Sequence, residues 1–420
     1  MRLILATAWP LLLGMLLIMM GHGLQSTLLG LRASAEGFSV TATGFIMSLY
    51  FIGFLIGSVY VPKLIGGVGH IRVFTAMASL ASITILMHGV FVEEWLWGLI
   101  RIITGFTFAG LYIVTESWLN DATTNETRGK IFSSYLMIIH LGLFSGQYFI
   151  GLTSIENLNL FVLVSVLVSL AVTPIALSRR PAPSFDYVEP FPLKRLLTIS
   201  PLGVIGIFAS GVTGATFFVI GAVATAEMGF SATQSATFIA AYVLGSAFIP
   251  PATGWLSDKI GRRRVIIGST ILATIFVSGG FFLQKEMLYG VAFLSGGFIV
   301  SLYGLCIAYM NDHLEPQQFV SASAAMILVN AAGAVFGPVI STFLMDMFGP
   351  QSFFAFLAGV LLSVTIFALY RSNVTQAIPI EEQADFVPVH QNTAATVIQI
   401  AEDDEEENEK DVDKFEYAKG

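Results

Sequence analysis

The segment GWLSDKIGRRR, residues Gly254 to Arg264, lies between two long apolar runs of the chain. Gly254 lacks a Cβ, so a neighbouring helix can approach it closely. Gly261 permits a turn with positive φ. Asp258 can bond either to the positive N-terminal end of a helix at 321–347 or to an arginine. The pattern predicts a short cytoplasmic turn between two membrane helices, although any short inner loop also gathers arginines.

The composition is that of a membrane protein. Of the 420 residues, 55% are apolar and 11% are charged, which is too little charge to cover a soluble surface of that size. Apolar runs of about 20 residues, each long enough to cross a hydrocarbon core of about 30 Å, recur along residues 1–371. We therefore predict an all-α multi-pass fold with twelve spans, at about 8–31, 42–62, 72–92, 95–118, 130–152, 158–178, 198–226, 233–256, 265–284, 287–310, 321–347 and 353–371.

The spans fall into two sets of six, separated by a polar break that is rich in proline and charge. We predict an N-terminal six-helix bundle at 1–178, a cytoplasmic linker at 179–197 and a C-terminal six-helix bundle at 198–371. Residues 372–420 are polar and end in a strongly acidic run, so we expect a disordered acidic cytoplasmic tail. The alternative is that part of the tail docks on the basic cytoplasmic loops.

Short motifs repeat between the two sets of spans. Gly142-x-x-x-Gly146 returns as Gly333-x-x-x-Gly337, and Asn120-Asp121 returns as Asn311-Asp312, both at an offset of 191 residues. Two matches at one offset favour a parallel repeat of six helices. Chance agreement between short apolar motifs is the alternative.

The distribution of Lys and Arg predicts the orientation. Nearly all basic residues of the short loops fall on the side that holds both termini, which we therefore place in the cytoplasm, with the protein in the cell inner membrane. Trp95 and Trp97 are expected as interfacial anchors at the outer end of the fourth span, and His88 as an interfacial residue. The net charge of −8 arises from the tail, so there is no basic surface for nucleic acid.

The loop at Gly254 matches the motif G-x-x-x-D-[RK]-x-G-R-[RK], and the chain resembles the major facilitator superfamily from residue 1 to about 371. Arg101-Ile-Ile-Thr-Gly105, Val114-Thr-Glu116-Ser117, Arg128-Gly129-Lys130 and Gly142-x-x-x-Gly146-Gln147 are similar to the YcaD-like bacterial group of that superfamily. The resemblance implies two six-helix bundles that move a small-molecule substrate by alternating access. It also implies a central cavity lined by helices one, four, five, seven, eight, ten and eleven.

The first-half copy of the loop motif, Gly57 to Arg72, departs from this pattern. It has no acid, and its path from Gly57 to Gly69 is five residues longer than the path from Gly254 to Gly261. We therefore expect asymmetric gating, with an acid in the inner latch of the second half alone. The residues predicted to form the cytoplasmic gating motif are Gly254, Asp258, Gly261, Arg262, Arg263, Glu116 and Arg128, with Glu116 meeting Arg128 or Lys130.

Few ionisable residues lie within the predicted spans of the first half. The resemblance associates Arg101 with proton coupling, while the alternative is that its side chain reaches the outer headgroups. His22 and Gln25 share a helix face, and a histidine can exchange a proton near neutral pH. We predict substrate binding or proton coupling at His22, Gln25, Arg101, His140, Gln147 and Tyr148. Structural hydrogen bonds to backbone carbonyls or neighbouring helices are the alternative for each.

Small polar residues in the second half form the matching set of candidates: Thr213, Tyr242 and Asn330. Any of them could hydrogen-bond a solute, although Ser and Thr are also ordinary packing residues in membrane helices. Asn330 is the strongest of them because an amide deep in an apolar helix needs partners, which a ligand or Arg101 could supply.

The sequence contains no P-loop, metal-ligand cluster or nucleophile elbow. We therefore expect no enzyme activity, cofactor or metal. The leading hypothesis is a secondary active transporter of a small organic solute, coupled to protons, in the lipid bilayer and monomeric by default. One alternative is a drug or metabolite exporter, which Gln147 disfavours because exporters of the family have proline there. The other is a transporter-derived receptor that signals through the acidic tail.

Overall fold

A computed structural model describes residues 2–121, 123, 125–176, 191–315, 318–374, 378–383 and 386. Within these residues every regular element is a helix. The elements are α1 (Arg2–Ala35), α2 (Val40–Val68), α3 (His70–Val90), α4 (Glu94–Asp121), α5 (Asn125–Tyr148), η1 (Phe149–Leu152), α6 (Asn159–Ala176), α7 (Leu193–Ile199), α8 (Pro201–Glu227), α9 (Ala232–Ile260), α10 (Arg262–Gly279), η2 (Lys285–Met287), α11 (Leu288–Asn311), α12 (Phe319–Phe348), α13 (Ser352–Val374) and η4 (Ile380–Glu382).

The twelve predicted spans correspond in order to α1–α6 and α8–α13. In the part of the chain that the structure describes, eleven helices are long and apolar enough to cross a membrane. Of the twelve helices that match predicted spans, only α10 is not among these eleven. Its 18 residues begin with Arg262, Arg263 and Arg264, which make it too charged. The prediction of an all-α multi-pass fold is thus confirmed.

The helices α2 and α9 are closely matched at both ends. Each has 29 residues, begins after a serine whose side chain accepts a backbone N–H, and ends at a glycine. These glycines, Gly69 and Gly261, have φ of 87° and 92°, a backbone conformation that costs other residues more. Each alone joins its helix to the next one, α3 or α10.

This match corrects our interpretation of the first-half loop. Counting back from the turn, the counterparts of Gly254 and Asp258 are Pro62 and Gly66. The choice of Gly57 as the counterpart of Gly254 was wrong, because both helices run unbroken to their glycine turns and Pro62 lies as far from its turn as Gly254 does. The absence of an acid at this first-half turn still holds.

The two sets of helices pack in the same manner. α1 packs on α5 and α6, α2 on α4, and α3 on α4 and α6. In the second set α8 packs on α12 and α13, α9 on α11, and α10 on α11 and α13. The packing partners therefore repeat in the same order, as a duplicated six-helix unit requires.

Glycines at the predicted repeat positions bring the backbones together. A Cβ on Gly146 would lie 2.2 Å from the Met20 carbonyl oxygen, and one on Gly337 would lie 2.3 Å from that of Val212. Both distances are too short for any side chain to fit without moving the backbone. Because equivalent glycines make equivalent contacts, α5 on α1 and α12 on α8, the structure supports the predicted repeat.

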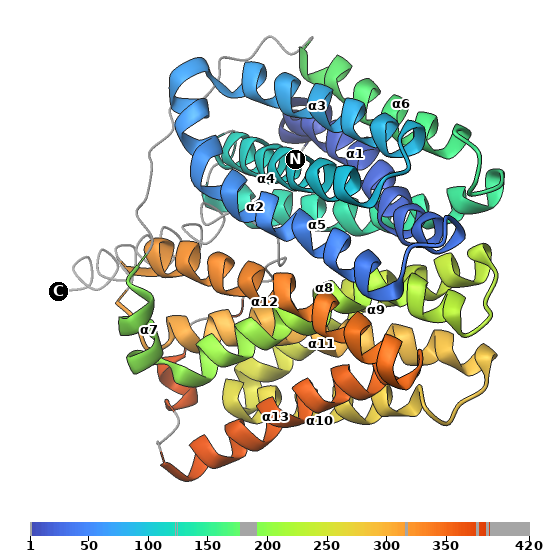
Figure 1. Ribbon diagram of the computed structural model, residues 1–420. Helices are drawn as coiled ribbons and strands as arrows, with labels where there is room; N and C mark the ends of the chain where they lie inside the picture. The colour runs from blue at the N-terminus through green and yellow to red at the C-terminus, as the bar shows by residue number, and fades with distance from the viewer. Residues whose placement is uncertain are drawn as a thin grey trace.

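Figure 1 shows α1–α6 in the upper part of the view and α7–α13 in the lower part. The two sets meet where α2 packs on α12, α5 on α9 and α1 on α8. We call the end of the molecule with residues 36–39 and 349–351 the Asp346 end, and the end with Gly69 and Gly261 the Asp258 end.

Hydrogen bonds join the two sets of helices at the Asp346 end. The backbone N–H of Thr41 donates to Asp346 Oδ2 at 2.9 Å, and the Thr41 hydroxyl donates to the same oxygen. Nearby, Gly44 lies so close to Thr342 that a Cβ would overlap the threonine side chain. Within the described residues, the side-chain hydrogen bonds between the two sets all lie there.

The predicted linker and tail are described in part. Residues 177–190 and 387–420 lie outside the described residues, and the domain boundaries stay predictions. Within the predicted linker, the Phe191 N–H donates to the Ser321 carbonyl of α12 at 2.9 Å, and helix α7 begins at Leu193. Within the predicted tail, η4 lies against α9.

Candidate functional site

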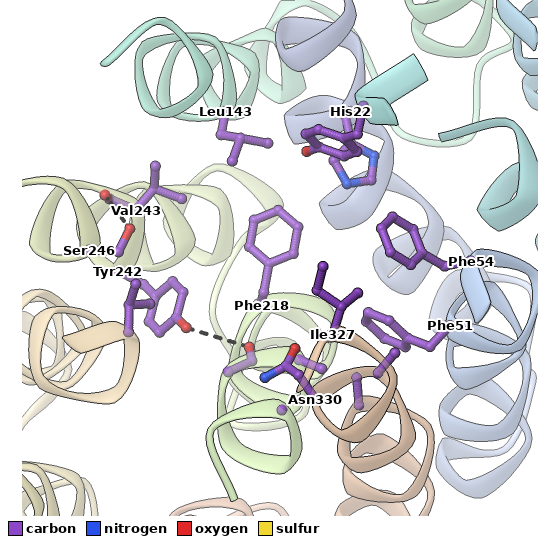
Figure 2. A pocket seen from close by; sticks show the side chains of 17 residues that line it. His22, Phe51, Phe54, Leu143, Phe218, Tyr242, Val243, Ser246, Ile327 and Asn330 are labelled. Atoms are coloured by element: carbon purple, nitrogen blue, oxygen red, sulfur yellow. Dashed lines mark hydrogen bonds between the residues drawn. The ribbon is translucent and has the colours of Figure 1, made fainter. Parts of the chain in front are cut away.

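An open pocket of about 780 Å³, solvent space at its mouth included, lies between the two sets of helices. Helices α1, α2, α4, α5, α8, α9, α11 and α12 contribute its walls, so neither half forms it alone. Figure 2 shows aromatic and aliphatic side chains converging on it from both sides. The lining includes three predicted residues, His22, Tyr242 and Asn330.

His22 lies among aromatic rings. Its imidazole is 4.3 Å from the ring of Phe108, 5.7 Å from that of Tyr50 and 6.0 Å from that of Phe218, measured between centroids. Phe218 comes from α8 in the other half and faces the same pocket (Figure 2). The buried Nδ1 atom of His22 has no hydrogen-bond partner among the described residues. His22 therefore brings an unsatisfied titratable group to the contact between the halves.

Arg101 lies behind this aromatic cluster. Its guanidinium carbon is 4.6 Å from the centroid of the Tyr50 ring, a cation–π contact. The side chain is 1% exposed, and its Nε and Nη1 atoms have no hydrogen-bond partner in the described part of the chain. The alternative that Arg101 reaches the outer headgroups is therefore wrong. Tyr50 instead connects Arg101 to His22 and the pocket.

Gly105 fixes this geometry. A Cβ at Gly105 would lie 1.8 Å from the Tyr50 carbonyl oxygen, and one at Gly53 would lie 1.9 Å from that of Ile102. The two glycines let α4 and α2 cross at backbone contact, which no larger residue permits. Arg101, one turn before Gly105, is thereby held against the Tyr50 ring.

The polar groups of the second half lie on the opposite wall of the pocket. Asn330 Nδ2 donates to the Ile207 carbonyl at 3.2 Å and to Ser210 Oγ at 3.0 Å, so α8 holds this amide and Arg101 does not. The Tyr242 hydroxyl lies 3.5 Å from the Gly214 carbonyl (Figure 2). Asn330 and Tyr242 thus present polar groups within an otherwise apolar wall.

Other predicted residues lie outside the pocket lining. Gln147 joins α5 to α1: its Nε2 donates to the Gly23 carbonyl at 2.8 Å, and its Oε1 accepts from Thr27 at 2.6 Å. His140 Nδ1 donates to the Leu136 carbonyl at 2.8 Å. The packing alternative thus accounts for contacts of both side chains.

The remaining predicted residues also lie away from the lining. Tyr148 is 54% exposed at the end of α5. Thr213 donates to the Ala209 carbonyl at 2.8 Å within its own helix. Gln25 is buried one turn beyond His22, and its Nε2 has no hydrogen-bond partner in the described residues.

Two residues expected at the membrane interface are buried instead. Trp97 is 1% exposed and its Nε1 donates to the Phe91 carbonyl at 2.7 Å. His88 is fully buried, with its ring 5.2 Å from that of Trp97. Both face the interior because α4 and α3 turn these positions toward the protein, while Trp95 is exposed as expected.

The loop motif forms a network at the Asp258 end. Arg262 Nη1 lies 3.3 Å from Asp258 Oδ1, and Arg262 Nε lies 2.6 Å from Asp312 Oδ2, just beyond α11. Arg263 Nη2 donates to the Tyr309 hydroxyl at 3.0 Å. Of the two predicted alternatives for Asp258, the structure gives the arginine partner. Arg262 thus also pairs with an acid from the segment that follows α11.

Glu116 is buried in α4 and accepts a hydrogen bond from the Tyr135 hydroxyl at 3.1 Å. Its predicted partner Arg128 has a side chain outside the described residues, so that pairing stays a prediction. Within the described residues, no group of three or more His, Cys, Asp or Glu side chains could hold a metal ion.

Sequence reasoning missed the aromatic residues Tyr50, Phe108 and Phe218. Only Tyr50 is connected to a motif in the sequence. Arg101-x-x-x-Gly105 indicates that another backbone approaches this face of α4, and in the structure that backbone includes Tyr50. The phenylalanines carry no such signal, since 35 of them are spread through the chain.

A family model described as the Major Facilitator Superfamily matches residues 11–199 and 202–399. The chain belongs to this superfamily. An uncharacterized MFS-type transporter YcaD from Escherichia fergusonii is 25% identical over 355 residues, covering 83% of this chain and 92% of the relative. The predicted resemblance to the YcaD-like group is thus confirmed.

Known structures share the facilitator fold. A mutant of the nucleoside transporter NupG superposes with a TM-score of 0.75 at 12% identity, covering 87% of this chain and 99% of that one. A bacterial homologue of the human lysosomal transporter Spinster, in an inward-facing and occupied conformation, superposes with a TM-score of 0.71 at 14% identity. The match covers 90% of this chain and 97% of that one. These likenesses establish the fold of this facilitator.

Proposed function

We propose that this facilitator is a secondary active transporter of a small organic solute, coupled to protons, with its solute site in the pocket between the two halves. The observation that carries the proposal is the composition of that pocket. Both halves contribute to it, so a relative movement of the halves changes its access, as alternating access requires. A few polar groups in an aromatic wall suit a solute with an apolar body.

His22 and Arg101 support proton coupling. His22 lines the pocket, and histidine is the side chain that changes charge near neutral pH in water. Its stacking partner Tyr50 is also the ring beneath Arg101. A proton on His22 adds a second positive charge next to the guanidinium. The packing of α1, α2 and α4 therefore depends on whether His22 is protonated.

We place the Asp258 end in the cytoplasm of a cell with an inner membrane, with Asp258 and Arg262 as the inner latch. The Arg and Lys residues of the short loops support this orientation. A cysteine at Lys259, in a Cys306→Ser background, should react with a membrane-impermeant maleimide in inside-out vesicles and not in intact cells. The reverse reactivity would contradict the orientation.

Binding of candidate solutes tests the pocket first. Purified protein is screened by thermal shift against nucleosides, sugars, organic acids, amino acids and cationic drugs. A ligand that binds the native state raises the melting temperature with its concentration. The Asn330→Ala variant should lose that response, whereas Ser363→Ala, on the exposed face of α13, should keep it. An unchanged response of Asn330→Ala would place the solute elsewhere.

Flux measurements then test proton coupling. In reconstituted vesicles, accumulation of the identified solute should collapse when a protonophore removes the proton gradient. His22→Gln should abolish accumulation while exchange of labelled for unlabelled solute continues, because the site remains and its proton carrier is lost. Accumulation that survives both treatments would show an uncoupled facilitator.

A drug or metabolite exporter is the second candidate. The aromatic wall formed by Phe51, Phe54 and Phe218 favours it, since such walls accept varied apolar compounds. Thermal-shift responses to several unrelated cationic drugs, and none to the polar solutes, would favour export.

A further inference from the structure

The walls of the pocket continue toward the Asp258 end. On α9, Val243 lines the pocket, and Gly254 follows three helical turns later on the same face. On α11, Val300 lines the pocket, and Gly304 follows one turn later. Gly254 and Gly304 therefore lie on the pocket-facing sides of α9 and α11, closer to the Asp258 end.

An aromatic side chain from the tail lies against these two glycines. A Cβ on Gly254 would lie 2.0 Å from Phe386 Cδ1, and one on Gly304 would lie 3.2 Å from its Cζ. The ring of Phe386 thus occupies the space left by two glycines on neighbouring helices, and it packs against the apolar core.

Two further contacts hold the same segment. The backbone N–H of Phe386 donates to Asp258 Oδ2 at 3.3 Å, so Asp258 uses one oxygen for Arg262 and the other for the tail. Ile380 lies 3.9 Å from the Cβ position of Gly261. Three positions of the loop motif, Gly254, Asp258 and Gly261, therefore all contact the tail.

The helix that α9 faces across the pocket is α5. The two helices pack together, and Figure 2 shows Leu143 of α5 opposite Val243 and Ser246 of α9. Hydrogen bonds between the halves lie at the Asp346 end. To close the Asp258 end, the α9 and α11 faces must approach the first half, and Phe386 occupies one of these faces.

We propose that residues 380–383 and 386 form a tail strap that holds the Asp258 end open and so slows the transport cycle. The strap is part of the same chain and follows closely after α13, which ends at Val374. Its effective concentration at the groove is therefore on the order of millimolar, as for a short tether. This inference rests on the proposed function, because a brake requires a cycle to slow.

Distances across the Asp258 end test the strap without any solute. Spin labels are placed at Ser133→Cys in α5 and Lys259→Cys in α9, in a Cys306→Ser background, and the full-length chain is reconstituted in lipid. Both labelled positions are exposed. The full-length chain should give one long distance. Phe386→Ala should add a shorter-distance population, which reports closure of the Asp258 end.

Truncations separate the strap from the acidic run. A chain ending after residue 377 should show the shorter population, and a chain ending after residue 392 should match the full length because it keeps Phe386. Phe386→Ala keeps the chain length, so misfolding through truncation cannot mimic its effect. Identical distance distributions for Phe386→Ala and the full-length chain would overturn the proposal, as would a change that appears equally in the 392-residue chain.

A synthetic peptide of residues 378–392, added to the 377-residue chain, should restore the long distance. Failure of the transport hypothesis would be visible separately, as absence of solute flux in vesicles whose label distances still respond to the strap.

Discussion

Arg101 is the residue whose surroundings are hardest to explain by packing alone. It is buried beneath Tyr50 with two guanidinium nitrogens unsatisfied among the described residues. A charge in this position costs several kcal/mol unless it is compensated. Fold stability does not require such a group, and this supports the role in the transport cycle that we propose for Arg101.

Substitution of Arg101 distinguishes a role in fold stability from a role in transport. Arg101→Met removes the charge and keeps a similar apolar length, so thermal stability in detergent should stay equal or rise by about 1 kcal/mol. Proton-driven solute accumulation should be lost. Arg101→Lys is the matched control, since it keeps the charge without the planar group that stacks on Tyr50. A large loss of stability in Arg101→Met would instead show that Arg101 is structural.

At the scale of elements, each half contains an equivalent helix crossing at which two backbones touch. Gly53 and Gly105 place α2 against α4, and Gly245 and Gly296 place α9 against α11, each with a Cβ position within 2.2 Å of a facing carbonyl oxygen. The first crossing holds Arg101 and the second holds Tyr242, so both walls of the pocket depend on it.

Gly105→Ala should therefore destabilise the protein by about 1–3 kcal/mol, because the added methyl group meets backbone atoms that cannot move away. Thermal unfolding in detergent measures the loss. Gly359→Ala in α13 is the control: nothing lies within 4 Å of its Cβ position, and its stability should be close to that of the parent. Equal melting temperatures for both variants would show that α2 and α4 can separate at no cost.

The turn at Gly261 joins three helices through buried charge. The side chains of Arg262 and Asp312 are 1% and 2% exposed and bond at 2.6 Å, which links the start of α10 to the end of α11. Asp258, at 30% exposed, contributes a weaker pair.

Arg262→Gln should lower the free energy of unfolding by about 3 kcal/mol, the usual effect of breaking a buried ion pair. In an Asp312→Asn background the same substitution should cost much less, because the carboxylate charge is already gone. A double-mutant cycle by thermal or denaturant unfolding gives the coupling. Additive effects of the two substitutions would refute a direct energetic link between these side chains.

At the scale of the whole molecule, the contact between the halves is uneven. Asp346 at the end of α12 accepts two hydrogen bonds from Thr41 in the first turn of α2, where a carboxylate also interacts favourably with the helix dipole. The loop-motif residue Asp258 bonds within its own half and to the tail. The described contacts thus favour a state closed at the Asp346 end.

Asp346→Asn should weaken that closure by about 1 kcal/mol and raise the open population about fivefold. A cysteine at Ala334, which lines the pocket, reports the opening through its rate of maleimide labelling from the Asp346 side in a Cys306→Ser background. Glu286→Gln, another exposed acid at that end, is the control. Equal labelling rates in both variants would show that Asp346 is not a latch.

Part of the site was predictable and part was not. His22, Tyr242 and Asn330 were predicted as isolated polar residues in apolar spans, and all three line the pocket. Gln147 and His140 satisfied the same criterion, yet their hydrogen bonds lie within helix packing. The criterion detects polar side chains in a membrane helix and does not show which way the helix faces.

The sequence alone determined the order of the twelve long apolar helices, α1–α6 and α8–α13, because each span must satisfy its backbone hydrogen bonds internally in hydrocarbon and so must be long, apolar and helical. It did not show the short helix α7 in the predicted linker. It also determined the turn at Gly254 to Arg264 and the repeat. Only the tertiary structure decided that Tyr50 lies between His22 and Arg101, and that Phe386 fills the space at Gly254. These contacts join segments far apart in the chain, and they depend on helix rotation and close approach, which local pattern does not encode.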